Sequence, residues 1–114
     1  MKADDITVRR LRTHPGDILR HELEVRGVSA NQLALALGVP SGRIVEILNR
    51  KRGISADTAL RLARYMGTSA EIWMNLQSQY DLSIAQQKSG RSIEARVHPG
   101  NHRTGMPKAR RAAG

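Results

Sequence analysis

The stretch ANQLALALGVPSGRIVEILN, residues 30–49, decides the fold of this chain. Apolar residues recur at helical spacing in both of its halves, at Leu33, Leu37, Ile44, Ile47 and Leu48. Each half therefore has the single apolar face of a short amphipathic helix. Gly38 follows the first half, where a residue without Cβ can adopt the left-handed conformation that ends a helix, and Ala34 is small enough for a close crossing. This pattern is typical of a helix-turn-helix.

The composition places the motif in a single basic domain. The chain has 114 residues, enough for one modest core, and no cysteine, so packing rather than disulfides or Cys-based metal sites must stabilise it. It carries 19 Lys and Arg residues against 10 Asp and Glu residues, and residues 90–114 hold six of the basic residues and one acidic residue. This balance favours a polyanionic partner, although a basic tail is equally consistent with RNA, an acidic protein or solubility.

The sequence predicts neither a membrane segment nor a targeting segment. Its longest apolar runs are far shorter than the roughly 20 residues of a transmembrane helix. Residues 1–13 lack the apolar centre of a signal peptide. We therefore expect an intracellular, cytoplasmic protein with no membrane partner.

Capping residues and glycines divide the chain into five predicted helices, so the expected fold is all-α. The predicted N-caps are Ser29, Ser55 and Ser69, and the predicted C-terminal glycines are Gly27, Gly38 and Gly67. Ser29 and Gln32 together form a capping-box pattern. The first helix is predicted to begin at Pro15, and its inner face holds Ile18, Leu19, Leu23 and Val25. The fifth helix is predicted to end at about Lys88.

The predicted domain organisation follows from these boundaries. It consists of an N-terminal arm at residues 1–12, a helix-turn-helix domain at 13–88, a dimerisation extension at 89–98 and a disordered basic tail at 99–114. Weak alternation over residues 92–97 predicts a short strand within the extension. The Gly, Asn, Pro, Lys and Arg content from Pro99 onward is typical of disorder.

Five runs of the sequence carry a family resemblance: PGDIL at 15–19, GVP at 38–40, ILNRKRGI at 47–54, ALRLA at 59–63 and IWMNLQ at 72–77. They resemble the HigA family of antitoxins, a branch of the Cro and phage-repressor-like helix-turn-helix group, over roughly residues 13–88. The resemblance implies a five-helix, lambda-repressor-like domain. It also implies an antitoxin that neutralises an mRNA-cleaving toxin and, as a dimer, represses their shared promoter. Members usually carry Gly where Arg50 stands, and often a basic or amide residue at positions 41 and 42.

In a DNA-binding helix-turn-helix the second helix enters the major groove, so its polar and small residues are candidates for contact. Arg43 in its first turn can reach O6 and N7 of guanine, or can pair with a neighbouring side chain. Ser41 can cap the helix or donate to a phosphate, and Gly42 allows close approach of the backbone. Glu46 can accept from cytosine N4, or pair with Arg43 or Arg50 along the helix.

Contacts with DNA phosphates are expected around the recognition helix. Four residues follow it directly: Asn49, Arg50, Lys51 and Arg52. They are placed to contact phosphates, which positions a protein without reading sequence, and a solvated basic loop is the alternative. Ser29 and Asn31, at the start of the preceding helix, are further phosphate candidates.

Apolar residues late in the chain predict a homodimer. Trp73 lies on the apolar face of the fifth helix and is predicted to be a core residue. Tyr80, Leu82 and Ile84 remain once the five-helix core is closed. We expect them to hold a second copy, with help from Ile93 and Val97 if that segment forms a strand.

Motifs for catalysis or cofactor binding are absent from the sequence. It contains no Gly-rich phosphate loop, no paired-carboxylate arrangement and no ordered Ser-His-Asp set, so we expect neither an enzyme nor a cofactor. His98 and His102 have a metal-like spacing, but Pro99 and Gly100 prevent a regular helix between them, so we expect no metal site.

Three functions are compatible with these patterns. The first is an antitoxin that also represses its own operon. The second is a stand-alone helix-turn-helix repressor with no toxin partner. The third is a toxin-binding protein with incidental DNA affinity, or an RNA-binding module that uses the basic tail. Only the first two predict tight binding to a palindrome.

Overall fold

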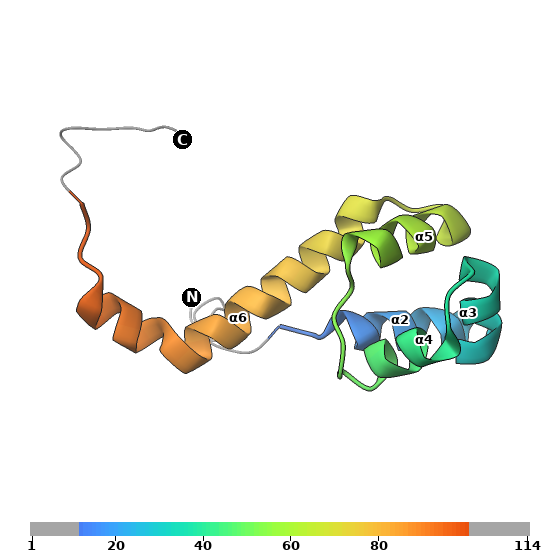
Figure 1. Ribbon diagram of the computed structural model, residues 1–114, viewed down its shortest axis with the longest axis horizontal. Coiled ribbons are helices and arrows are strands. Elements are labelled where there is room, and N and C mark those ends of the chain that lie inside the picture. Colours follow the sequence, from blue (N-terminus) through green and yellow to red (C-terminus); the bar gives the residue numbers. More distant parts are fainter. Residues whose placement is uncertain (1–11, 101–114) are drawn as a thin grey trace.

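The computed structural model describes residues 12–100 and shows an all-α fold (Figure 1). Its helices are α2 (Pro15–Arg26), α3 (Ala30–Leu37), α4 (Ser41–Leu48), α5 (Ala56–Met66) and α6 (Ala70–Arg96). Five helices and no strand within residues 12–100 confirm the predicted five-helix architecture. Most of the predicted arm, residues 1–11, and most of the predicted tail, residues 101–114, lie outside the described residues.

The predicted caps mark the helix ends in the structure. Ser29 and Gln32 form the predicted capping box, because Ser29 Oγ accepts from Gln32 N at 3.1 Å and Gln32 Oε1 accepts from Ser29 N at 2.8 Å. Ser55 and Ser69 likewise accept backbone N–H groups at the starts of α5 and α6. The glycines that end α2, α3 and α5 have positive φ angles, 68° at Gly27, 71° at Gly38 and 73° at Gly67. Local sequence therefore determines most of the helix boundaries.

The start of α2 is capped by a histidine, which the sequence analysis did not anticipate. His14 is the N-cap, and its Nδ1 accepts from Gly16 N at 2.8 Å. The His14 ring is buried and meets the Tyr80 ring of α6 edge to face, with 4.8 Å between ring centroids. Burial lowers the pKa of His14, although Asp17 opposes the shift. The buried ring therefore favours its neutral form.

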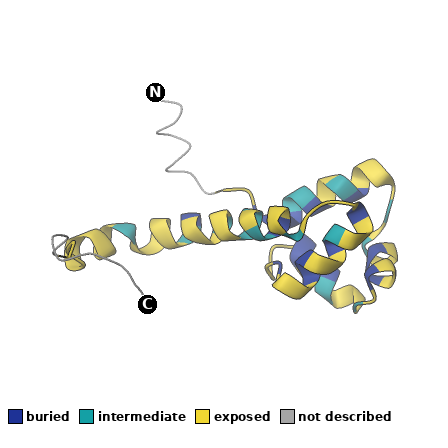
Figure 2. Ribbon diagram, turned by 90° about the horizontal axis from the view of Figure 1, so that it is seen from above, coloured by how far each residue is buried: buried dark blue, intermediate teal, exposed yellow. Residues whose placement is uncertain are grey.

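One core joins all five helices. It is built from Leu19, Leu23, Leu33, Ala34, Leu37, Ile44, Ile47, Leu48, Ile54, Ala59, Leu62, Met66 and Trp73. The burial of Trp73, which is 3% exposed, confirms its predicted core position. Val25 was predicted to face inward, and this was wrong: it is 70% exposed because it lies off the face that carries Leu19 and Leu23. In Figure 2 the buried residues gather where α2 to α5 meet the first part of α6.

The close approach of α2 to α4 depends on a glycine. A Cβ built on Gly16 would collide with the carbonyl oxygen of Ile47. Only a residue without a side chain therefore lets the first turn of α2 lie against the second half of α4. Gly16 belongs to the run that carries the family resemblance, and the structure supplies a packing reason for it.

The last helix is longer than predicted. α6 contains 27 residues, so it is about 40 Å long, and it includes residues 92–96 of the segment 92–97 that was predicted to be a strand, with Val97 as its C-cap. The strand prediction was wrong because Ile93 and Val97 are also four residues apart, and Val97 N donates to Ile93 O as in a helix. Figure 1 shows that α6 extends beyond the other helices and bends in its last third.

The middle of α6 is attached to the segment that precedes α2. Ser83 is buried, and its Oγ accepts from Arg12 N at 3.1 Å and donates to Tyr80 O at 2.7 Å. Together with the contact between His14 and Tyr80, this fixes α6 against the body up to about residue 83. Beyond it, α6 residues are mostly exposed (Figure 2). Between residues 12 and 100 no helix has both the length and the apolar character needed to cross a membrane.

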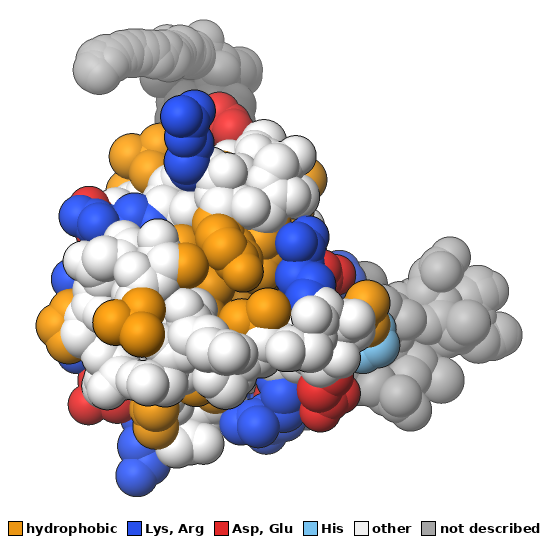
Figure 3. Space-filling view, turned by 90° about the vertical axis from the view of Figure 1, so that its right-hand side faces the viewer, with side chains coloured by type: hydrophobic (Ala, Val, Ile, Leu, Met, Phe, Trp, Pro, Cys, Tyr) orange, Lys and Arg blue, Asp and Glu red, His pale blue; other side chains and the backbone are white. Residues whose placement is uncertain are grey.

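A shallow hollow lies between α3 and α5. Its lining is mainly apolar, from Ala36, Leu37, Leu60 and Tyr65, with Arg61 and Arg64 beside them. Figure 3 views this end of the molecule and shows apolar side chains gathered between basic ones. Arg61 crosses from α5 and its Nη1 donates to Leu37 O, at the end of α3, at 2.9 Å. The contact between α3 and α5 is therefore partly polar.

We predict that Gly16→Ala lowers the free energy of unfolding by about 2 kcal/mol or more, because the new methyl group forces α2 away from α4. Gly42→Ala is the matched control, since a Cβ there meets no atom within 4 Å. Alanine also favours a helix over glycine, so the control should be neutral or more stable by up to about 1 kcal/mol. Urea denaturation of both variants measures the difference, and equal effects would contradict the packing role of Gly16.

We also predict that stability falls as the pH drops below 6.5. In the unfolded chain His14 binds a proton near its ordinary pKa of 6.5, whereas in the folded protein burial lowers that pKa. The unfolded state then binds more protons, so stability is highest above pH 6.5 and is lost as the pH falls through the folded pKa. Asn can accept from Gly16 N without titrating, so the midpoint for His14→Asn should change less between pH 8 and pH 5. An unchanged pH dependence in this variant would assign the effect to another group.

Candidate nucleic-acid interface

The candidate recognition helix, α4, has one buried and one exposed face. Ile44 and Ile47 are fully buried and Leu48 is 9% exposed, so they anchor α4 to the core. The opposite side is exposed and consists of Gly42, Val45, Glu46 and, just after the helix, Asn49. Arg20 of α2 supports the end of α4, since its Nη2 donates to Leu48 O at 3.1 Å. This arrangement leaves a protruding surface of the kind that enters a major groove.

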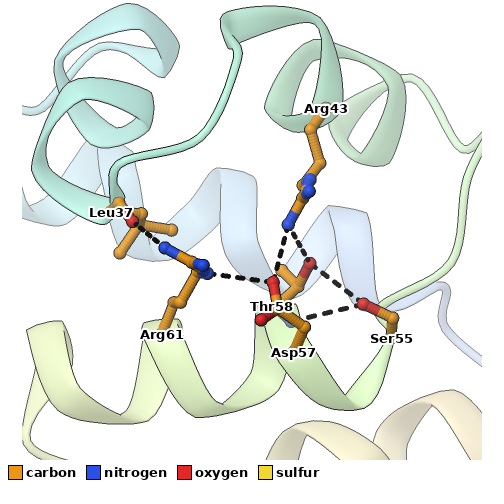
Figure 4. A network of polar contacts seen from close by, with 6 residues as sticks. All are labelled: Leu37, Arg43, Ser55, Asp57, Thr58 and Arg61. Carbon is orange, nitrogen blue, oxygen red and sulfur yellow. Dashed lines mark hydrogen bonds and ion pairs between the residues drawn. The ribbon is translucent and has the colours of Figure 1, made fainter.

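Arg43 is turned toward α5 rather than straight out from α4 (Figure 4). Its Nη1 donates to Asp57 Oδ2 at 2.9 Å and to Thr58 Oγ1 at 3.5 Å, and its side chain is 27% exposed. Pairing with a neighbouring side chain was the predicted alternative to base reading, and Arg43 has this arrangement in the structure. The prediction that Arg43 reads guanine remains untested, and such a contact would require Arg43 to exchange Asp57 for a base.

Asp57 serves two arginines at once. Its Oδ2 accepts from Arg61 Nε at 2.9 Å as well as from Arg43, and Arg61 also reaches the backbone of α3 (Figure 4). The donation from Arg61, and then that from Arg43, holds the pKa of Asp57 below its ordinary value. One carboxylate on α5 is therefore linked to both helices of the helix-turn-helix.

Arg50 occupies a backbone position that suits glycine. Its φ is +63°, and within residues 12–100 it is the one residue other than glycine with a positive φ. Its guanidinium forms two hydrogen bonds with Asp17, from Nε to Oδ1 at 3.1 Å and from Nη2 to Oδ2 at 2.6 Å. These bonds lower the pKa of Asp17. The glycine that the family resemblance leads us to expect here thus has a conformational reason, and in this chain an ion pair opposes the strain of the side chain.

Glu46 pairs with a residue that the sequence analysis did not name for it. The carboxylate accepts from Arg52 Nε at 2.8 Å, so the expected partners Arg43 and Arg50 were wrong, and they pair with Asp57 and Asp17. The reason is the tight turn after α4, which brings Arg52 back alongside the helix. Lys51 is exposed and has no ion-pair partner among the described residues.

Ser29, Ser41 and Asn31 lie at the N-terminal ends of α3 and α4, but only Ser29 caps its helix. Ser41 was expected as a possible cap of α4, and this was wrong: the N-cap is Pro40, no side chain caps the helix, and Ser41 is its first residue. Ser29 is used in the capping box of α3, whereas Asn31 in its first turn is exposed. Ser41 and Asn31 therefore remain exposed at the N-terminal ends of the two motif helices.

Val45 is a surface residue of α4 that the sequence analysis overlooked. Its side chain is 43% exposed although its neighbours Ile44 and Ile47 are buried. A helical projection contains the signal, because Val45 lies off the stripe defined by positions 44, 47 and 48. Within the described part of the chain, no group of three or more His, Asp or Glu side chains is placed to hold a metal ion.

Comparison with known proteins agrees with this geometry. A helix-turn-helix family model matches residues 19–73. Virulence-associated protein I of Dichelobacter nodosus is 56% identical over 75 residues, which cover 65% of this chain and 69% of that protein. An addiction module antidote protein of a HigA family from Coxiella burnetii is 50% identical with a TM-score of 0.77, covering 80% of this chain and 100% of the other. Pseudomonas aeruginosa antitoxin HigA, solved with the higBA promoter, is 48% identical with a TM-score of 0.75, covering 76% and 96%.

The buried scaffold and the protruding face of α4 define a helix-turn-helix protein of the DNA-binding class. Two features identify the family within this class: the run 72–77 around the buried Trp73, and the sequence identity of 48–50% with solved antitoxin and antidote proteins. The chain belongs to the HigA family of antitoxins, which confirms the resemblance drawn from its sequence.

The strain at Arg50 gives a testable order of stabilities. Arg50→Gly loses the ion pair with Asp17 but relieves the left-handed conformation, whereas Arg50→Ala loses the ion pair and keeps the strain. We therefore predict that the glycine variant has a higher urea midpoint than the alanine variant. The reverse order would mean that the backbone at position 50 relaxes freely once Asp17 is released.

Proposed function

We propose that this protein is the antitoxin of a type II toxin-antitoxin module, and that it represses its own operon by binding a palindromic operator as a homodimer. The observation that carries the proposal is the exposed face of α4 on a fold that matches an antitoxin solved with its promoter, at 48% identity and a TM-score of 0.75. The alternative is a stand-alone repressor. Both functions include operator binding, and only the antitoxin also binds a toxin.

The proposed DNA contacts start from exposed groups. Gly42 and Ser41 at the start of α4 allow close approach to the groove, and Asn31 lies at the start of α3. Lys51 follows α4 and is exposed, and it has no ion-pair partner within residues 12–100, so it is the strongest candidate for a phosphate contact. Helix N-termini supply N–H donors and lysine supplies positive charge, and both bind the negatively charged phosphates of DNA.

Other candidate contacts have to change partners or share them. Arg43, Arg50 and Arg52 are paired with Asp57, Asp17 and Glu46. All three pairs are partly exposed, and exposed ion pairs contribute little to stability, so a phosphate or a base can replace the carboxylate at low cost. Ser29 and Asn49 complete the proposed surface. Ser29 N and Oγ are both used in the capping box of α3, so Ser29 would have to share one of these bonds with a phosphate, whereas Asn49 lies exposed at the end of α4.

The proposed dimer surface is the outer part of α6. Leu82 is 61% exposed, Ile84 is half-buried, and Ile93 and Val97 are 52% and 65% exposed. Tyr80 is also half-buried, but its ring already packs on His14, so we assign it a smaller share. A second copy packed along this helix would bury apolar side chains that a single copy leaves in water.

The remaining parts of the proposal follow from the family. We propose that the partner protein is a cognate mRNA-cleaving toxin, that the protein itself is not an enzyme and needs no cofactor, and that it acts in the cytoplasm, where an operator would be bound. A small basic reading frame beside this one, whose toxic product is neutralised by co-expression of this protein, would support the antitoxin. A neighbouring product that is neither toxic nor bound would favour the stand-alone repressor.

We predict that Leu82→Glu gives a folded monomer, because a carboxylate cannot be buried unpaired in an apolar interface. Leu60→Glu is the matched control, since Leu60 is 64% exposed on α5, and it should remain dimeric. Sedimentation measures the assembly. Selection from a random duplex library measures binding, and wild type should enrich inverted repeats with half-sites about 34–36 Å apart. A dimeric Leu82→Glu variant would place the interface elsewhere, and no enrichment by wild type would contradict operator binding.

A further inference from the structure

We propose that Val45 determines part of the operator sequence by packing against the C5-methyl group of a thymine in each half-site. This inference rests on the proposed operator binding and adds the base that one side chain recognises. Val45 belongs to α4, the helix whose free face is turned away from the core.

Val45 is distinguished by its position on α4 more than by its exposure. A single exposed valine on a protein surface is ordinary. On α4, however, the other three large aliphatic side chains are 0–9% exposed, whereas Val45 is 43% exposed and shares the outward side with Gly42, Glu46 and Asn49. An apolar side chain is thus presented by the helix that enters the groove.

The side chains around Val45 leave it room to approach the bases. Arg43 is two residues from Val45 and therefore lies on nearly the opposite side of α4, whether it pairs with Asp57 and Thr58 or contacts DNA. In the free protein Glu46 is paired with Arg52. Gly42 has no side chain, and a Cβ built there would meet no atom within 4 Å, so the start of the helix can lie close to the bases. Val45, one turn further along, then reaches the groove floor without a long polar side chain in front of it.

The chemical groups in the major groove indicate which base Val45 would contact. An aliphatic side chain cannot donate or accept a hydrogen bond, and the apolar group that base pairs offer in this groove is the thymine methyl. Removing a methyl group from an apolar contact costs roughly the transfer free energy of one CH₂ group, which corresponds to a loss of affinity of about fourfold. Each half-site should therefore contain one thymine whose methyl group contributes to binding.

Replacing thymine by deoxyuridine tests this directly, because the base pair with adenine is kept and only the methyl group is lost. A duplex enriched from the random library is used, and each thymine is replaced in turn. We expect one position per half-site at which the replacement weakens binding of wild type about fourfold. For Val45→Ala the same replacement should have no effect, since its shorter side chain no longer reaches the methyl group.

Val25→Ala is the matched control, because Val25 is 70% exposed on α2 and loses the same two methyl groups. It should keep the wild-type response to deoxyuridine. Circular dichroism and the urea midpoint establish that both variants fold. If no duplex is enriched, the proposed operator binding itself fails. If a duplex is enriched but no thymine is sensitive, or the sensitive thymine is unchanged in Val45→Ala, then operator binding stands and the role of Val45 is refuted.

Discussion

An eight-residue helix is not stable alone in water, and this constraint governs the structure around α4. The helix exists because Ile44, Ile47 and Leu48 are buried against the rest of the domain. That burial requires α2 to approach closely, which Gly16 permits, and it requires α3 to end where Gly38 turns the chain. The surface available for DNA is what remains of α4 after its attachment to the core.

Local signals made most of the fold predictable. Serine caps and left-handed glycines act within one helical turn, so Ser29, Ser55 and Gly67 could be assigned from sequence alone. The end of α6 could not be assigned from sequence. The spacing of Ile93 and Val97 fits a helix, whereas the weak alternation over residues 92–97 fits a strand. His14 also escaped notice, since its capping role depends on a buried setting provided by Tyr80, 66 positions later in the chain.

The candidate site was predictable as a region but not as a set of contacts. The sequence located α4 and the basic residues after it, because periodicity and charge are visible in one dimension. The partners of those residues are distant in sequence: Asp57 lies 14 positions from Arg43, and Asp17 lies 33 positions from Arg50. Val45 was overlooked because it is as apolar as the nearby buried residues Ile44 and Ile47, and only its angle around the helix distinguishes it.

The shared carboxylate of Asp57 has a consequence for how such proteins diverge. Because Arg43 and Arg61 donate to the same oxygen, a substitution at position 57 or 61 on α5 alters how firmly Arg43 is held on α4. Effects of substitutions at these three positions should not be additive. If Arg43 contacts DNA as proposed, changes in α5 can alter DNA preference, and two paralogues with identical recognition helices need not share an operator.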